Sequence, residues 1–269
     1  MPTAPHRTVV APHIPLLAAT LQLLCATACL LGGTPLGRPS TRLYATPTDG
    51  AAAPPSSTPP ITTVVIDAGH GGEDGGASSA SMVVEKDVNL SVAFALRDLL
   101  EAAGIPVVMT RTEDKLLYDR NVNFQGRKKV LDLAARRLIA EKTAEAAAAE
   151  GGGSLFISIH MNAFPAEQYS GMQVWYSTGD PRSKEIADSI QSAALPLMPE
   201  NRRQTKAAGS GIYLLHRIRT PAVLVECGFL SNPAEADRLA DPRYQNALAA
   251  AILLGTSSHL APKDLPADP

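Results

Sequence analysis

The sequence predicts a single α/β domain with a mostly parallel, mixed sheet covered by helices on both faces. Short apolar runs of strand length alternate along the chain with longer segments whose apolar residues recur at helical spacing. Strands separated by helices in this way usually pair in parallel, and the helices then cover both faces of the sheet. The composition agrees, because 45% hydrophobic and 19% charged residues are typical of a globular protein.

Two segments of different character precede the domain, which we expect at residues 61–260. Residues 1–33 contain an apolar stretch after Arg7, a pattern typical of a secretory signal or of an uncleaved membrane anchor. Residues 34–60 are rich in Pro, Thr, Ser and Ala and are expected to form a flexible linker, and residues 261–269 a flexible tail. The domain is therefore expected to act outside the cytoplasm and to contact a membrane only through its N-terminal segment.

The first half of the domain is predicted to alternate strand and helix twice. Residues 64–66 form a short apolar run before a Gly-rich loop, and residues 105–109 form the next run. The segment between them has apolar residues at helical spacing and ends at Gly104, a residue type that commonly ends helices. An Ala-rich helix at residues 130–149 should stop at the glycines that begin with Gly151.

The second half contributes three more strands and three helix starts. The strands are expected at residues 155–159, 171–176 and 222–225. Asp180, Asn232 and Asp241 each precede a proline, which is typical of the first turn of a helix. Glu235 stands three residues after Asn232, so a capping box is predicted there.

Four side chains that can hold a metal ion or move a proton fall at the ends of these elements. His70, His160 and Glu226 follow apolar strand runs, and Glu85 opens the first helix. The carboxyl ends of parallel strands meet at one edge of the sheet, where open α/β sheets bind ligands. Two histidines and Glu85 would leave one position of a zinc ion open for water, and Glu226 is then a spare carboxylate suited to be a general base. His70 taken alone is equally compatible with an ordinary turn residue. The carboxylates expected to contact its second ring nitrogen are Asp67, Glu73 and Asp74.

Four sequence blocks around these residues resemble the signature blocks of the zinc-dependent N-acetylmuramoyl-L-alanine amidases of the amidase type 3 family. The blocks lie at residues 65–76, 85–90, 158–163 and 225–232. Four blocks in the family's order, spanning nearly all of residues 61–256, are far more specific than one Gly-rich loop. Residues 206–215 and 220–224 look most like the spore-cortex, germination-related amidases of endospore formers.

This resemblance implies one Zn²⁺ ion held by His70, Glu85 and His160, with Glu226 as the catalytic glutamate. The implied substrate is the peptidoglycan glycan strand with its stem peptide. The implied reaction is hydrolysis of the amide bond between the lactyl group of N-acetylmuramic acid and L-alanine. A role in spore-cortex maturation, through muramic lactam formation, and an activating protein partner are further expectations from the resemblance.

The resemblance extends to three polar residues for which it allows two roles. Arg111 and Arg136 resemble family positions, and Asn162 lies in the third block; we expect these residues either to orient the substrate or to support the fold. Division-type members of the family carry an inhibitory helix before the catalytic strand. The chain passes from His160 to Gly179 with no room for such a helix, so we expect a site without that plug.

Two functions without turnover are the alternatives: a zinc-containing module for cell-wall binding or assembly, and a phosphate-binding protein that uses the glycine loop. The intact Glu226 favours the enzyme, and the loop lacks both the P-loop Lys and the dinucleotide-binding spacing. A net charge of −2 without a Lys/Arg stripe argues against a nucleic-acid partner. Cys227 is expected to be a small buried thiol, Trp175 a core residue and His216 a solvated residue at the rim.

Overall fold

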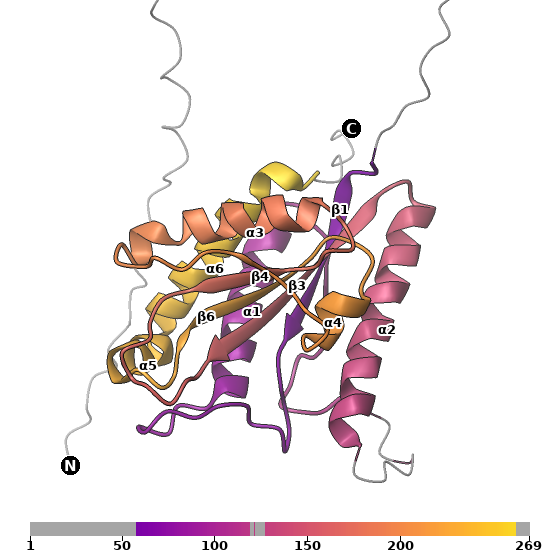
Figure 1. Ribbon diagram of the computed structural model, residues 1–269. Coiled ribbons are helices and arrows are strands. Elements are labelled where there is room, and N and C mark those ends of the chain that lie inside the picture. Colours follow the sequence, from indigo (N-terminus) through magenta and orange to yellow (C-terminus); the bar gives the residue numbers. More distant parts are fainter. Residues whose placement is uncertain (1–57, 119–120, 122–126, 262–269) are drawn as a thin grey trace, which may run out of the picture. The chain divides into compact units, whose positions relative to one another are not determined.

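The computed structural model describes residues 58–118, 121 and 127–261, which form a six-stranded mixed sheet with helices on both faces (Figure 1). The strand order is β2-β1-β3-β6-β4-β5. The first four of these strands run in parallel, β4 is antiparallel to β6, and β5 is parallel to β4. The strands are β1 (Ile61–Ala68), β2 (Val107–Met109), β3 (Gly153–Asn162), β4 (Gln173–Tyr176), β5 (Lys206–Ala207) and β6 (Ala222–Phe229). The fold class predicted from the sequence is confirmed.

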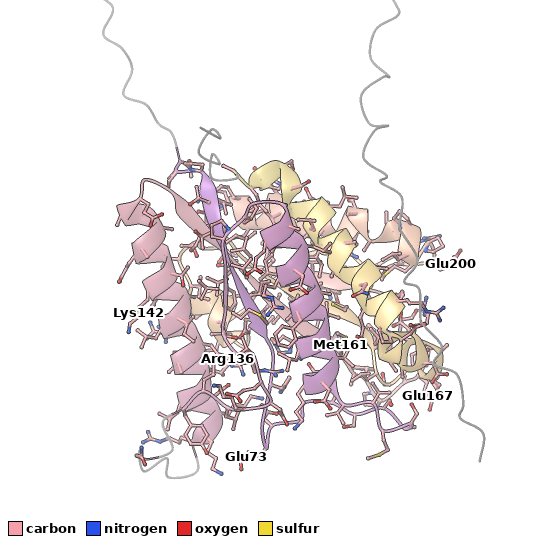
Figure 2. All side chains as sticks on the ribbon, turned by 180° about the vertical axis from the view of Figure 1, so that it is seen from behind. Glu73, Arg136, Lys142, Met161, Glu167 and Glu200 are labelled. Carbon is pink, nitrogen blue, oxygen red and sulfur yellow. The ribbon has the colours of Figure 1, made fainter. Side chains whose placement is uncertain are left out.

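The helices divide into two layers. They are α1 (Glu85–Ala102), α2 (Lys128–Ala149), α3 (Arg182–Ala193), α4 (Tyr213–Arg217), α5 (Pro233–Ala240) and α6 (Pro242–Thr256), with short 3-10 turns at Leu195–Leu197 and Ser257–His259. In Figure 2, α1 and α6 lie in front of the strands. Helix α3 packs beside α6 in the same layer, and α2 lies with α4 on the opposite face.

The larger core lies between the sheet and the α1, α3 and α6 layer. Leu96 and Leu100 of α1 are completely buried among inward-facing residues of β1 and β3 such as Ile66 and Ile157. Apolar positions at i and i+4 fall on one face of a helix, which is why this face of α1 meets the sheet. Burial of these side chains is the main source of stability for the domain.

A smaller core lies under α2 and α4. Val65, Phe156 and Leu224 alternate with the residues of the larger core along β1, β3 and β6, so they face the opposite side. Ala140 of α2 and Leu215 of α4 pack against them. The same alternation places Asp67, Ser158, His160 and Glu226 on this face of the sheet.

The predicted helix ends are largely confirmed. Gly104 has a φ of 75°, the left-handed conformation in which glycine follows the end of a helix, and its N–H donates to the carbonyl of Glu101. The Asn232 side chain accepts from the N–H of Glu235, and the Asp241 side chain accepts from that of Arg243.

Three details of the sequence prediction are wrong. β3 and β6 continue past His160 and Glu226 to residues 162 and 229, because both strands keep pairing beyond the site. The capping box at Asn232 is incomplete, since the Glu235 carboxylate accepts from the N–H groups of Gly171 and Phe229. His216, which the sequence places after an apolar run of strand character, lies within the short helix α4.

The expected signal or anchor at residues 1–33, the linker up to residue 57 and the tail after residue 261 lie outside the described residues, as do Cys25 and Cys29. Within the part of the chain that the structure describes, no helix combines the length and the apolar character needed to cross a membrane.

Candidate metal centre

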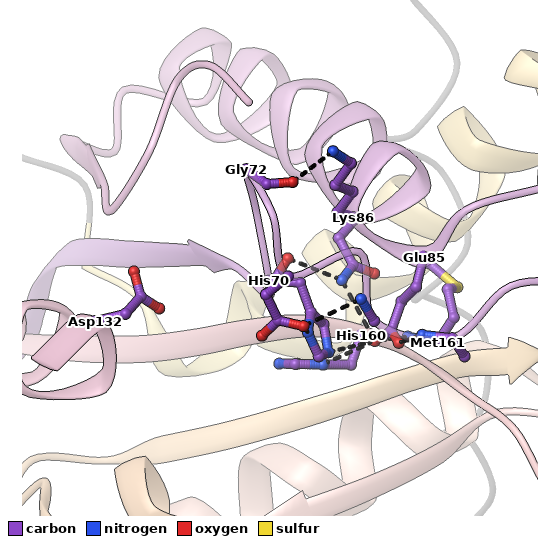
Figure 3. Close-up of polar contacts among 12 residues, drawn as sticks. His70, Gly72, Glu85, Lys86, Asp132, His160 and Met161 are labelled. Carbon is purple, nitrogen blue, oxygen red and sulfur yellow. Dashed lines mark hydrogen bonds and ion pairs between the residues drawn. The ribbon is translucent and has the colours of Figure 1, made fainter. Parts of the chain in front are cut away.

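His70, Glu85 and His160 converge at the carboxyl edge of the sheet (Figure 3). One potential ligand atom from each lies within 4.8 Å of the others. Oε1 of Glu85 is 3.2 Å from Nε2 of His70 and 3.0 Å from Nδ1 of His160, so both imidazoles point at the same carboxylate oxygen. The rings themselves meet edge to face with their centroids 5.0 Å apart.

Each of the three residues is placed by a different element. His160 is on β3, Glu85 is the first residue of α1, and His70 is in the loop after β1. A carboxylate in the first turn of a helix is favoured by the partial positive charge of the helix N-terminus. His70 has a φ of 61°, a left-handed conformation that is uncommon for residues other than glycine.

Glycines provide the space in which the three side chains meet. A Cβ atom on Gly69 would collide with the imidazole ring of His160, and one on Gly76 would collide with the carboxylate of Glu85. Gly76 also has a φ of 68°, which disfavours any larger residue. The glycines of the loop are therefore needed for the geometry of the cluster.

The electrostatics of the cluster keep the carboxylate ionised. Burial alone would raise the pKa of Glu85, but hydrogen bonds and charge from His160 and His70 hold that pKa far below its usual range. Burial opposes the positive charge on His70, yet Glu85 and Asp74 raise the pKa of His70 above its ordinary value. Glu85 also accepts from the N–H groups of Ala77, at 2.8 Å, and Met161, at 3.2 Å.

The second ring nitrogen of His70 lies beside Asp74, one of the three expected carboxylates. Nδ1 of His70 is 2.9 Å from Oδ1 of Asp74, a close ion-pair distance, although the two groups are not aligned as a hydrogen bond. Asp67 instead binds Arg136, and Glu73 forms an ion pair with Lys128.

Glu226 lines the same cavity as His70 and His160 without taking part in the cluster. The cavity has a volume of about 260 Å³. One carboxylate oxygen, Oε2, is buried and has no hydrogen-bond partner within the described part of the chain. Burial raises the pKa of Glu226 to about 7, with His160 and His70 lowering it and Glu85 raising it. A carboxyl group with such a pKa can both accept and return a proton near neutral pH.

Arg136 supports the loop that carries His70. Its guanidinium is 1% exposed and binds Asp67 and Asp132, each at 2.7 Å. The same guanidinium donates to the backbone carbonyls of Ala68 and His70, both at 2.7 Å. Buried arginine of this kind fixes backbone position through several directed hydrogen bonds at once.

Arg111 supports the loop from a second direction. It is 2% exposed and donates to the carbonyls of Ala68, Gly69 and Lys86, at 2.8, 2.9 and 2.7 Å. The loop before His70 is thereby tied to the first turn of α1, which carries Glu85. Both arginines therefore use these N–H donors to bind backbone carbonyls of the domain itself.

Two supporting residues could not be recognised from the sequence. Asn89 is completely buried one turn after Glu85 and donates to the carbonyl of Gly69 at 3.1 Å. Asp132 accepts from Arg136 and from the N–H of Leu117 at 2.6 Å. In the sequence, each of these two residues is only a polar residue at helical spacing from a site residue. Helices on the surface of proteins have the same pattern.

The other polar and aromatic residues lie apart from the cluster. Asn162 is at the end of β3, where its carbonyl accepts from Leu230, and it does not line the cavity. His216 is exposed, and Trp175 packs against the smaller core. Cys227 is completely buried in the larger core, where burial raises the pKa of its thiol.

The donor set of the cluster fits a zinc ion. Zinc is bound in proteins by imidazole nitrogens and carboxylate oxygens, and catalytic sites use three such ligands with a fourth position open. Two imidazole nitrogens and one ionised carboxylate oxygen already face a common point here. The carboxylate that remains, Glu226, opens onto the same cavity.

The fold and the side chains at its carboxyl edge define the class of this protein as an α/β enzyme with a candidate metal centre. A sequence model of the family described as N-acetylmuramoyl-L-alanine amidase matches residues 64–258. The chain therefore belongs to the N-acetylmuramoyl-L-alanine amidase family of hydrolases, as the four sequence blocks predicted.

Individual relatives agree with this assignment. The chain is 37% identical over 185 residues to the germination-specific N-acetylmuramoyl-L-alanine amidase of Bacillus subtilis, a match that covers 68% of this chain and 74% of the relative. It is 37% identical to the CwlD amidase of Clostridioides difficile, solved in complex with the GerS lipoprotein, with a TM-score of 0.67 over 74% of this chain and 98% of that one. The catalytic domain of the amidase CwlV from Bacillus (Paenibacillus) polymyxa is 29% identical, with a TM-score of 0.61 over 76% and 100% of the two chains.

Proposed function

We propose that the protein is a zinc-dependent peptidoglycan amidase in which His70, Glu85 and His160 hold one Zn²⁺ ion and Glu226 acts as general base. The observation that carries this proposal is the combination of a three-donor cluster with a buried, unpartnered carboxylate oxygen that opens onto the same cavity. The bond cleaved is the amide between the lactyl group of N-acetylmuramic acid and L-alanine of the stem peptide.

The residues divide the chemistry between them. Zinc, when bound, lowers the pKa of its water to about 7 and polarises the scissile carbonyl. Glu226 would take a proton from the attacking water and return it to the departing L-alanine nitrogen, because its side chain lines the cavity and its buried Oε2 has no hydrogen-bond partner among the described residues. Arg111 and Arg136 act as positioning residues, because their buried guanidiniums hold the His70 loop by its backbone carbonyls.

The relatives support a more specific setting. Similarity to a germination-specific amidase supports action outside the cytoplasm on spore-cortex peptidoglycan, with muramic lactam formation as the outcome. The CwlD amidase was solved together with a lipoprotein, which supports a protein partner for this chain as well. In this proposal, residues 1–33 direct export or anchor the domain.

Metal analysis tests the ligand assignment. The purified protein should contain close to one equivalent of zinc, and His160→Ala should lose most of it because one of three ligands is removed. His216→Ala is the matched control, since that exposed histidine on α4 belongs neither to the three-donor cluster nor to the residues that line the cavity. Full zinc content in His160→Ala would reject the assignment.

Glu226→Gln separates the chemistry from metal binding. The amide keeps the shape of the side chain but cannot accept the water's proton. We expect zinc content to persist while release of stem peptide from peptidoglycan falls on the order of 10²- to 10⁴-fold. Mass spectrometry of the digest also identifies the bond that is cleaved. Full activity, or loss of zinc together with activity, would contradict the role of Glu226.

A further inference from the structure

Four residues near the carboxyl edge form a partly exposed aromatic patch: Phe164, Tyr169, Phe229 and Arg203. Phe164 is 52% exposed and Tyr169 is 39% exposed. Their rings meet edge to face at 4.8 Å, and Tyr169 stacks on the buried ring of Phe229 at 6.3 Å. The Arg203 guanidinium lies 4.2 Å from the Phe229 ring centre and 5.7 Å from that of Tyr169.

The aromatic patch is held in place by polar contacts. The N–H of Phe164 donates to the Ser231 hydroxyl at 3.0 Å, and Nε of Arg203 donates to the carbonyl of Ser170 at 2.8 Å. Asn232 donates to the carbonyl of Glu167 at 2.9 Å and ties the same loop to the start of α5. Apolar rings that stay exposed on an anchored loop are typical of a binding surface.

Strand register places the aromatic patch next to the metal centre. His160 pairs with Glu226 across β3 and β6, and two residues further along β3, Asn162 pairs with Phe229. Three residues of strand from Glu226 to Phe229 correspond to about 10 Å. Arg203 also reaches within 3.4 Å of the side chain of Gln173, which pairs with Glu226 across β4.

One exposed ammonium group lies on the β1 side of the cavity, where its charge also acts on Asp74. Lys129 is exposed at the start of α2 and lines the cavity together with Asp74 and Asp132. Those two carboxylates already face His70 and Arg136, respectively. In Figure 2, Glu73, the ion-pair partner of Lys128, lies near the start of α2, and Glu167, whose carbonyl accepts from Asn232, lies near α5.

The substrate in the proposed function has two chemically different arms that meet at the cleaved bond. The glycan arm is a chain of uncharged N-acetylated sugar rings with apolar faces. The peptide arm carries free carboxylates. An aromatic surface suits the first arm, and an exposed ammonium group suits the second.

We infer that peptidoglycan crosses the site in one direction, with the glycan strand stacked on Phe164 and Tyr169 and the stem peptide directed toward Lys129. This inference rests on the proposed amidase function and adds the orientation of the substrate. Arg203 keeps the Tyr169 ring in position and offers donors to the carbonyl groups of the sugar N-acetyl substituents.

The glycan arm is tested with Phe164→Ala, a change of an exposed side chain that leaves the cores intact. The KM for peptidoglycan with long glycan strands should rise about three- to tenfold, in keeping with the loss of one aromatic contact. The rise should be smaller for a single disaccharide-peptide. Leu254→Ala is the matched control, because Leu254 is a 67% exposed apolar residue on α6. Binding of uncharged N-acetylglucosamine oligomers, measured by calorimetry, gives a readout without turnover and should weaken in Phe164→Ala.

The peptide arm is tested with Lys129→Gln. The KM should rise about two- to fivefold for stem peptides with free carboxylates and should change less for stems whose carboxylates are amidated, and added salt should reduce the difference. Lys142→Gln is the control, since Lys142 is exposed on the same helix and lies well along α2 from the Glu73 end in Figure 2.

Failure of the inference and failure of the proposed function give different results. A wild-type protein that releases no stem peptide would overturn the amidase proposal, whatever the variants do. A wild-type protein that cleaves, with Phe164→Ala and Lys129→Gln both indistinguishable from their controls, would overturn only the orientation. If Lys129→Gln impaired glycan binding, and the effect of Phe164→Ala depended on the stem carboxylates, the substrate would lie in the opposite orientation and the inference would be wrong.

Discussion

The two faces of the sheet are covered by different kinds of side chain. The face under α1, α3 and α6 buries a continuous apolar core that includes Leu96 and Ile157. The face under α2 and α4 has a smaller apolar core and, next to it, the buried ionic network of Asp67, Asp132 and Arg136.

The difference reflects two physical requirements. Apolar burial is non-directional and supplies stability in proportion to area, but it does not fix a backbone carbonyl to within an ångström. Buried charge is costly to desolvate and adds little net stability, yet its hydrogen bonds are directional. One face therefore stabilises the domain, while the other positions the loop of His70.

The largest effect should follow Arg136→Met, which fills similar space but leaves the buried carboxylates of Asp67 and Asp132 without their cation. We expect a loss of about 3–5 kcal/mol in the free energy of unfolding. Zinc affinity should fall as well, because the carbonyl of His70 loses its donor. Urea unfolding and zinc titration measure the two effects. Arg137→Met is the control. Arg137 is next to Arg136 and forms a half-exposed ion pair with Glu141, so this change should lower the free energy of unfolding by no more than about 1 kcal/mol.

A comparable loss of stability without a loss of zinc affinity should follow Leu96→Ala on the other face. Removing this completely buried side chain should cost about 2–5 kcal/mol through lost burial and the cavity that remains. The folded fraction should bind zinc as tightly as the wild type, because no contact to the site is lost. Equal losses of zinc affinity in Leu96→Ala and Arg136→Met would show that the two faces do not have separate roles.

Lowering the pH should reduce the stability that the buried ionic network under α2 contributes. Burial alone would raise the pKa of Asp67, but the charge of Arg136 and hydrogen bonds from Ser158 and Thr110 lower that pKa below its usual range. Because the folded-state pKa is lowered, the ionised carboxylate contributes stability above about pH 4, and this contribution is lost as the pH falls through the folded-state pKa. The difference in unfolding free energy between the wild type and Asp67→Asn should therefore shrink below about pH 4. A difference that stays constant from pH 6 to pH 2 would disprove this linkage.

The smallest effect should follow Asn232→Ala. This change removes the side-chain cap of α5, which accepts from the N–H of Glu235 at 3.1 Å, and the hydrogen bond that Asn232 donates to the carbonyl of Glu167, and together these losses should cost about 1–2 kcal/mol. It leaves both faces of the sheet untouched, so zinc affinity should not change. The midpoint of thermal unfolding, followed by circular dichroism, is a suitable measurement, and a cost near that of Leu96→Ala would assign Asn232 a larger role than capping.

The fold could be predicted because its longer strands form apolar runs, α1 has apolar residues at helical spacing, and α2 is an Ala-rich segment that ends at glycines. Gly104 and Asp241 also marked helix boundaries correctly, since their conformations or side-chain bonds are local. Strand ends were less accurate, because pairing with neighbours extends β3 and β6 beyond their apolar runs. β5 has two exposed residues, Lys206 and Ala207, and no sequence signal of its own.

The convergence of His70, Glu85 and His160 could be predicted because each follows or opens a recognisable element. The supporting network could not, because, apart from Asp132 and Arg136 at i and i+4, its partners are 15 or more residues apart in the chain. Arg136 binds Asp67 across 69 positions, and a sequence pattern gives no indication of such a pair. For the same reason, Glu235 was predicted to cap its own helix, although it binds Gly171 and Phe229 instead.

The alternation along β6 limits how the length of this strand can change. Val225 and Cys227 face the apolar core, and Glu226 between them faces the opposite side. Partners on both sides fix the register, with His160 and Gln173 each opposite Glu226. Inserting or deleting one residue before Glu226 would move the carboxylate into the apolar core and leave a valine or a thiol in the cavity. Side chains along β6 can therefore change, but keeping Glu226 in the cavity requires that the residue count from Ala222 to Glu226 stay the same.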